Sequence, residues 1–79
     1  MQQKHQNLIK LGKKIREYRK KHGYSQEAIA AESELDRAYF GRVDRGSANI
    51  SFQNLVKIAL ALRVEISALV PTLKELKSP

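Results

Sequence analysis

The stretch SQEAIAAESELDRAYFGRVDRG, residues 25–46, contains two short apolar patterns separated by a few polar residues. Ser25 is a preferred helix N-cap, and Glu27 suits the positive end of a helix dipole, so a helix is predicted to follow Ser25. SELD ends this helix, and Asp36 is the expected N-cap of another that runs from Arg37 to about Arg45 and stops at Gly46. Isolated helices of under about 12 residues are marginal in water, so both need tertiary packing.

The small and apolar residues of this stretch indicate how the two helices pack. Ala30 is small where two helices must approach closely, and Leu35 is an apolar residue in the turn. Phe40 and Val43 form the inner face of the second helix, while its remaining faces carry arginine. Two helices joined by a turn of three or four residues form a helix-turn-helix, which places its second helix in the DNA major groove.

The rest of the chain also has helical periodicity. Apolar residues recur every three or four positions from Leu8, and Gly23 ends that helix. Ser51 is the expected N-cap of a helix to about Leu62, and EISALV (65–70) predicts a fifth, short helix. No strand-like alternation occurs. The prediction is an all-α, compact, five-helix domain over residues 1–79, with a loose N-terminus at 1–7, a core at 8–70 and a tail at 71–79 in which TLKELK adds a frayed turn.

Composition limits the classes of function. The 79 residues include 15 Lys and Arg against 8 Asp and Glu, a net charge of +7 that suits a polyanion, nucleic acid first and an anionic membrane surface second. The chain has no cysteine, and His5 and His22 have no ligand-like spacing, so no metal site is expected. No catalytic triad, carboxylate pair or phosphate-binding glycine loop is present, so neither an enzyme nor a cofactor is expected.

The whole pattern resembles a known family, the phage repressor and Cro-like (XRE-type) helix-turn-helix regulators, over roughly Leu8 to Val70. The resemblance rests on Gln26-Glu27, Ala30, Leu35, Phe40, Val43 and DRG at 44–46, followed by NIS and LVKIALAL. Within the family, LDRAYFGRVDRGSANIS looks most like controller proteins of restriction–modification systems. The chain departs from the family at Glu34 and Arg63, where glycine is usual. A positive φ at Glu34 would cost on the order of 1 kcal/mol.

The second helix of the motif supplies the candidates for reading bases. An arginine fork matches guanine O6 and N7, so Arg37 and Arg42 are candidates for base contact, with phosphate contact or a solvated face as the alternative. Ala38 either touches a thymine methyl group or is a filler with good helix propensity. Tyr39 either packs on the DNA backbone or is partly buried against a neighbouring helix.

Further residues are candidates for phosphate contact. The resemblance implies such a contact for Gln26, which could also brace Arg37. Helix starts and their loops bind phosphate through backbone N–H groups, and Arg45 joins the set by its charge. These candidates are Arg45, Ser47, Asn49 and Gln53. The resemblance also implies a structural ion pair between Arg19 and Asp44, in which removing one partner is more harmful than removing both.

A dimer is expected from energetics and from the resemblance. One short helix buries too little surface to select one site among many. A two-fold dimer through the fifth helix would place two recognition helices about 34 Å apart, one turn of DNA. The expected interface residues are apolar: Ile66, Leu69, Val70 and Leu73.

The leading hypothesis is a sequence-specific dimeric transcription regulator, namely a restriction–modification controller, that binds a double-stranded DNA operator. The alternatives are a phage or plasmid repressor and an antitoxin-type regulator that also binds a protein partner. A peripheral membrane binder is disfavoured because the lysine face of the first helix lacks large apolar residues. RNA polymerase is a further candidate partner, whereas no membrane or small-molecule partner is expected. Without a signal peptide or apolar span, the expected location is cytoplasmic.

Overall fold

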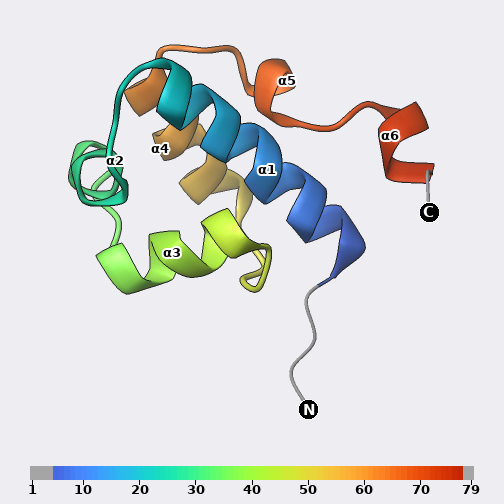
Figure 1. Cartoon of the computed structure of the whole chain (residues 1–79), viewed down its shortest axis with the longest axis horizontal. Helices are drawn as coiled ribbons and strands as arrows, with labels where there is room; N and C mark the ends of the chain where they lie inside the picture. Colours follow the sequence, from blue (N-terminus) through green and yellow to red (C-terminus); the bar gives the residue numbers. More distant parts are fainter. Residues whose placement is uncertain (1–4, 78–79) are drawn as a thin grey trace.

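The computed structural model describes residues 5–77, and every element of regular secondary structure in this part of the chain is a helix (Figure 1). Its helices are α1 (Gln6–Lys21), α2 (Gln26–Glu32), α3 (Arg37–Arg45), α4 (Phe52–Leu62), α5 (Ile66–Leu69) and α6 (Leu73–Lys77). The all-α fold class is confirmed. None of the helices described is long and apolar enough to cross a membrane.

Three helices begin at the residues that the sequence indicates. The side-chain oxygens of Ser25, Asp36 and Ser51 each accept a hydrogen bond from the backbone N–H three residues further on, at 3.0, 3.0 and 3.1 Å. These bonds satisfy N–H groups that have no partner within their own helix. The starts of α2, α3 and α4 are therefore set by local chemistry.

The helix ends use left-handed backbone. Gly23 and Gly46 have φ values of +77° and +79°, and Glu34 and Arg63 adopt φ values of 57° and 59°. Both non-glycine residues therefore carry the mild strain expected of a side chain in this region. At the turn after α2, the N–H of Leu35 donates to the carbonyl of Ala30 at 2.8 Å, which closes the helix end.

The core lies where α1, α2, α3, α4 and α5 meet, and six large side chains in it are almost completely buried: Ile15, Ile29, Phe40, Ile58, Leu62 and Leu69. α1 crosses α3 closely because Gly12 has no side chain. A Cβ at this position would stand 2.6 Å from the carbonyl oxygen of Val43. This contact holds α3 against the body of the protein by one face.

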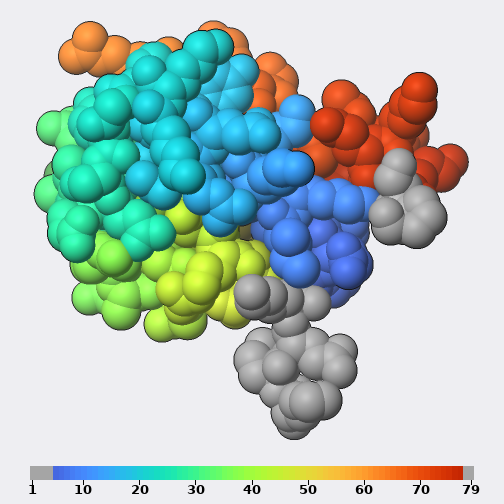
Figure 2. All heavy atoms as spheres, in the orientation of Figure 1, coloured from blue at the N-terminus to red at the C-terminus, as the bar shows by residue number. Residues whose placement is uncertain are grey.

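Both ends of the chain differ from the prediction. α1 begins at Gln6, so residues 6 and 7 of the expected loose N-terminus are helical, and the His5 side chain accepts from the Asn7 N–H at 3.2 Å. Residues 1–4 lie outside the described part. The expected frayed turn near the C-terminus is the helix α6, which rests against α1 (Figure 2).

α6 is ordered by its own capping interactions. The Thr72 N–H donates to Glu75 Oε1 at 2.7 Å, and the Glu75 N–H donates to Thr72 Oγ1 at 3.1 Å, which together form a capping box. Lys14 Nζ lies 3.3 Å from Glu75 Oε1, and Lys10 Nζ donates to the Glu75 carbonyl at 2.6 Å. The tail is thus tied to α1, and Pro71 before it is buried.

Candidate nucleic-acid interface

α2 and α3 are joined by the four residues 33–36 and pack against the core as a helix-turn-helix (Figure 1). Phe40 and Val43 are 0% and 2% exposed, so they hold α3 to the core as the sequence indicates. The opposite face of α3 is open to solvent. Its exposed residues are Arg37, Ala38, Arg42 and Arg45.

Two of these arginines lie along one ridge of α3, over Gly41. A Cβ at Gly41 would stand 3.0 Å from Arg37 Nη1 and 3.3 Å from Arg45 Nη1. The absence of a side chain at Gly41 therefore lets both guanidinium groups lie close to the helix backbone. Gly41 was not among the predicted site residues, although its spacing of four residues from each arginine places all three on one face of the helix.

Arg37 also has an acidic neighbour on α2. Its Nε lies 3.4 Å from Glu27 Oε2, and both side chains are accessible, at 46% for Arg37 and 75% for Glu27. A hydrogen bond from the backbone N–H of Glu27, followed by the positive charge of Arg37, holds the pKa of the Glu27 carboxyl below its ordinary value of 4.5. The carboxylate is therefore ionised at neutral pH, and its charge lies beside the Arg37 guanidinium.

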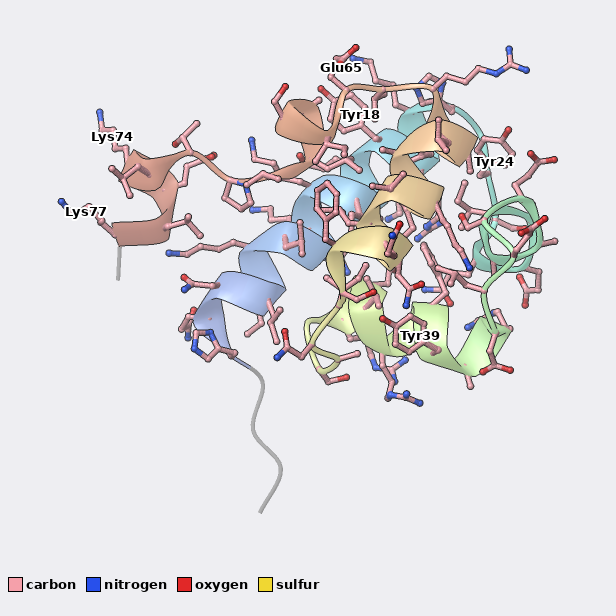
Figure 3. The ribbon with its side chains drawn as sticks, turned by 180° about the vertical axis from the view of Figure 1, so that it is seen from behind. Tyr18, Tyr24, Tyr39, Glu65, Lys74 and Lys77 are labelled. Carbon is pink, nitrogen blue, oxygen red and sulfur yellow. The ribbon has the colours of Figure 1, made fainter. Side chains whose placement is uncertain are left out.

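Tyr39 lies between α3 and α4 (Figure 3), where its hydroxyl accepts a hydrogen bond from Asn54 Nδ2 at 3.1 Å. The ring is partly buried, and the Arg42 guanidinium carbon lies 5.6 Å from its centroid. Tyr39 thus takes the partly buried position that was one of its two expected roles. Its ring also supports Arg42 on the solvent side of α3.

Asp44 connects α3 to α1 and α2. The expected ion pair is present, with Arg19 Nη2 at 3.3 Å from Asp44 Oδ2, and both side chains are buried. Gln26 Nε2 donates to the same oxygen at 2.8 Å, and Arg16 Nη1 donates to the Asp44 carbonyl at 3.2 Å. Three polar side chains from two other helices therefore orient the recognition helix through one residue.

Some of the residues expected to contact phosphate are exposed and others are partly buried. Gln26, for which the resemblance implies a phosphate contact or a brace for Arg37, is partly buried and its amide donates to Asp44. Asn49 and Gln53 are exposed, and Ser47 is half-buried with its hydroxyl donating to the Arg42 carbonyl at 3.3 Å. The exposed members of this set are Arg45 at the end of α3, Asn49 in the following loop and Gln53 in the first turn of α4.

The residues expected at a dimer interface differ in how exposed they are. Leu69 is 0% exposed because α5 turns it into the core, so its side chain cannot contact a second copy, and this part of the expectation is wrong. Val70 and Leu73 are 39% and 72% exposed, and Ile66 is partly buried against the core. A short helix that closes a core must turn at least one apolar residue inward, and the sequence pattern does not show which residue that is.

The geometry defines a class of protein, one that presents the second helix of a helix-turn-helix to solvent with a cationic face. The family described as Helix-turn-helix matches residues 15–69. This match spans more than half of the chain, and the protein belongs to that family.

Particular relatives narrow the comparison. Control protein C.MunI of Mycoplasma sp is 40% identical over 62 residues, which cover 77% of this chain and 84% of C.MunI. The restriction-modification controller protein C.AhdI from Aeromonas hydrophila is similar in structure, with a TM-score of 0.81 and 45% identity over 82% of this chain and 98% of C.AhdI. The biofilm regulator SinR, solved in complex with DNA, has a TM-score of 0.71 and 32% identity over 75% of this chain and 95% of SinR.

Proposed function

We propose that this protein is a sequence-specific, homodimeric DNA-binding transcription regulator that acts as a controller of a restriction–modification system. The observation that carries this proposal is the exposed arginine face of α3. The opposite face of α3 is held against the rest of the protein by the contacts of Asp44 with α1 and α2 and by the buried side chains of Phe40 and Val43. A preorganised cationic helix suits a duplex groove better than a mobile one, because less entropy is lost on binding.

The roles within this surface follow from position. Arg37, Ala38 and Arg42 lie on the solvent side of α3 and are the proposed contacts to base edges. Arg45, Asn49 and Gln53 lie further along and are the proposed contacts to phosphates. Similarity to the control protein C.MunI and the controller C.AhdI supports the controller role over other regulators.

Selection of bound sequences from random double-stranded DNA tests the proposal directly. A dimer of this protein should enrich two half-sites whose centres are about 34 Å apart, or a multiple of one helical turn. Recovery of unrelated sequences, or of a single half-site, would contradict a sequence-specific dimer. A methyltransferase or endonuclease gene beside its own gene would support the controller role.

Arg37→Ala distinguishes base reading from charge. If Arg37 contacts a base pair, this variant should lose roughly 1–3 kcal/mol of discrimination, so that affinity for the selected site falls far more than affinity for random DNA. Fluorescence anisotropy with the two labelled duplexes measures both affinities. Arg63→Ala, which removes an exposed arginine outside α3, is the matched control. An equal loss on both duplexes would make Arg37 a phosphate contact.

A further inference from the structure

Most of the positive charge of this chain lies outside the helix-turn-helix. Residues 25–46 contain five acidic and three basic residues, which gives this segment a net charge of −2. The helix α1 contains seven basic residues and one acidic residue, a net charge of +6. The arginines of α3 are therefore set in an acidic segment, and the charge that attracts a polyanion is concentrated on α1.

The seven basic residues of α1 divide into two sets by residue type. Arg16 and Arg19 reach toward α3, where Arg16 binds the carbonyl of Asp44 and Arg19 binds its carboxylate. The other five are lysines, and together they form what we call the lysine face: Lys10, Lys13, Lys14, Lys20 and Lys21. The arginines of α1 thus stabilise the fold, and its lysines are left for another role.

The lysine face is held at one place by the tail and is open to solvent elsewhere. Two of its lysines contact Glu75 of α6. Lys13 and Lys20, which lie two helical turns apart, are exposed, and neither forms an ion pair with another residue of 5–77. Their ammonium groups are therefore available to an anion outside the protein.

A hollow of about 300 Å³ lies beside the lysine face, between α1 and the segment after α5. Three of the lysines and Glu17 line it on the side of α1, and Pro71 and Glu75 line it on the side of the tail. Lys13 is one of these three lysines. The lysine face is thus concave where its charges are most closely spaced, a shape that suits a protruding phosphate group.

We propose that the lysine face of α1 binds the phosphate backbone of a second segment of double-stranded DNA, independently of its sequence. The proposal rests on the DNA binding by α3 in the proposed function and adds a contact that α3 does not make. Lysine suits this task because its compact ammonium group binds phosphate as a point charge. The fork of arginine suits the base edges that are assigned to α3.

The two contacts use different sides of the molecule. On α3, Phe40 and Val43 face the core and the arginines face outward. On α1, Ile15 faces the same core, and the outer surface of the helix is open along its length (Figure 2). A duplex bound to α3 therefore occupies no residue of the lysine face.

Charge density favours a duplex over other polyanions. The lysine face extends over about 16 Å at a rise of about 1.5 Å per residue. This length of duplex axis carries roughly nine phosphates, whereas an extended acidic peptide of the same length spans about five residues. A membrane is disfavoured because the exposed large apolar side chains of residues 5–77 all lie outside α1.

Lys13→Gln/Lys20→Gln and Arg63→Gln/Lys77→Gln form a matched pair of variants for the test. Each removes two positive charges at exposed positions, and the second pair lies outside α1. Glutamine and lysine have nearly the same helix propensity, so α1 should fold normally in the first variant. Each protein is first bound to its selected duplex in stoichiometric amounts, which occupies α3.

A labelled random duplex is then added to each complex, and its anisotropy measures the second contact over a salt series. Two lost phosphate contacts should make the slope of log K against log salt less negative by about 1.8 in Lys13→Gln/Lys20→Gln, at about 0.9 each. The control variant should keep the wild-type slope. A wild-type complex that does not bind the random duplex, or an equal effect of the two variants, would overturn the proposal.

NMR titration locates the contact without a selected duplex. A random duplex added to the free, isotope-labelled protein should shift the backbone amide signals of Lys13 and Lys20 in addition to those of α3. Inorganic phosphate at the same phosphate concentration should shift them far less, because the duplex presents its charges together. Equal shifts with inorganic phosphate or with polyglutamate would overturn the assignment to DNA.

The two proposals fail separately. If a sequence is selected from random DNA but the NMR shifts are confined to α3, this inference alone is refuted. If the lysine face responds to random DNA but no sequence is ever selected, the proposed function alone is refuted.

Discussion

At the scale of single residues, Asp44 is the point where the buried polar chemistry of the protein converges. It is 2% exposed and is bound by the side chains of Arg19 and Gln26, while Arg16 donates to its carbonyl oxygen. Burying a carboxylate is unfavourable unless it is paired and hydrogen-bonded. The attraction in these contacts therefore mainly compensates the cost of removing the charged groups from water, and adds little net stability. Their role is to fix the position of α3.

Removal of one partner should therefore be more harmful than removal of both. Asp44→Leu leaves the buried guanidinium of Arg19 without its counter-charge and is expected to lower the free energy of unfolding by about 3–5 kcal/mol. The double variant Arg19→Met/Asp44→Leu should lose less than Asp44→Leu alone. Urea unfolding of these two variants and of Arg19→Met measures the differences, and a double variant at the sum of the two single losses would contradict this coupling.

At the scale of elements, Gly12 and Gly41 face different kinds of neighbour: Gly12 faces backbone atoms, and Gly41 faces the ends of flexible side chains. Gly12 permits the backbone contact between α1 and α3, where a Cβ would meet two carbonyl oxygens at 2.6 and 2.7 Å. Gly41 lies under the guanidinium groups of Arg37 and Arg45, which are the ends of flexible side chains and can move. The same substitution should therefore have different consequences at the two positions.

Gly12→Ala should lower the free energy of unfolding by about 1–3 kcal/mol, because overpacking against backbone exceeds the gain in helix propensity. Gly41→Ala should leave the stability unchanged or raise it by up to about 1 kcal/mol, yet weaken DNA binding by displacing both arginines. Thermal unfolding and DNA titration of the two variants measure these effects. A stable Gly12→Ala protein would contradict the close α1–α3 contact.

One carboxylate, that of Glu75, contributes to the attachment of α6. The backbone N–H of Thr72, and to a smaller extent Lys14, holds the pKa of Glu75 below its ordinary value of 4.5. Because the folded-state pKa is lowered, this contribution to stability is fully present above about pH 4.5 and is lost as the pH falls through the folded-state pKa. Acidification should therefore weaken the contact between α6 and α1.

Glu75→Gln should have a similar effect at neutral pH. Without the charge, the ion pair with Lys14 is lost and the α6 backbone chemical shifts should move toward random-coil values. Lys77→Gln, on the exposed side of the same helix (Figure 3), is the control and should leave α6 as it is in the wild type. Unchanged α6 shifts in Glu75→Gln would show that Leu76 and Pro71 suffice to hold the segment.

At the scale of the whole molecule, the net charge affects binding both to DNA and to a second copy of the chain. A net charge of +7 attracts a duplex and repels a second copy, so DNA affinity should fall steeply with salt while the dimer should tighten or stay unchanged. Each phosphate neutralised should add about −0.9 to the slope of log K against log salt. Anisotropy titrations across a salt series measure this slope, and a flat response would contradict a phosphate-contacting cationic surface.

Much of the fold could be predicted because its signals are local. Ser25, Asp36 and Ser51 cap helices through bonds to residues three positions away, and Gly23 and Gly46 end helices through their own backbone freedom. The capping box of Thr72 and Glu75 is equally local, and it accounts for the five-residue helix α6 where the sequence predicted a frayed turn. The direction of a side chain on a short helix is different, since it depends on what packs against it.

The sequence by itself determined an all-α chain with a helix-turn-helix, the starts of α2, α3 and α4, and the arginines of α3, because periodicity and capping act within a few residues. Only the tertiary structure decided that Leu69 points into the core, that Gln26 binds Asp44, and that Leu8, Phe52 and Leu76 meet in one uncharged groove. These outcomes depend on contacts between residues far apart in the chain, where many arrangements share the same local pattern.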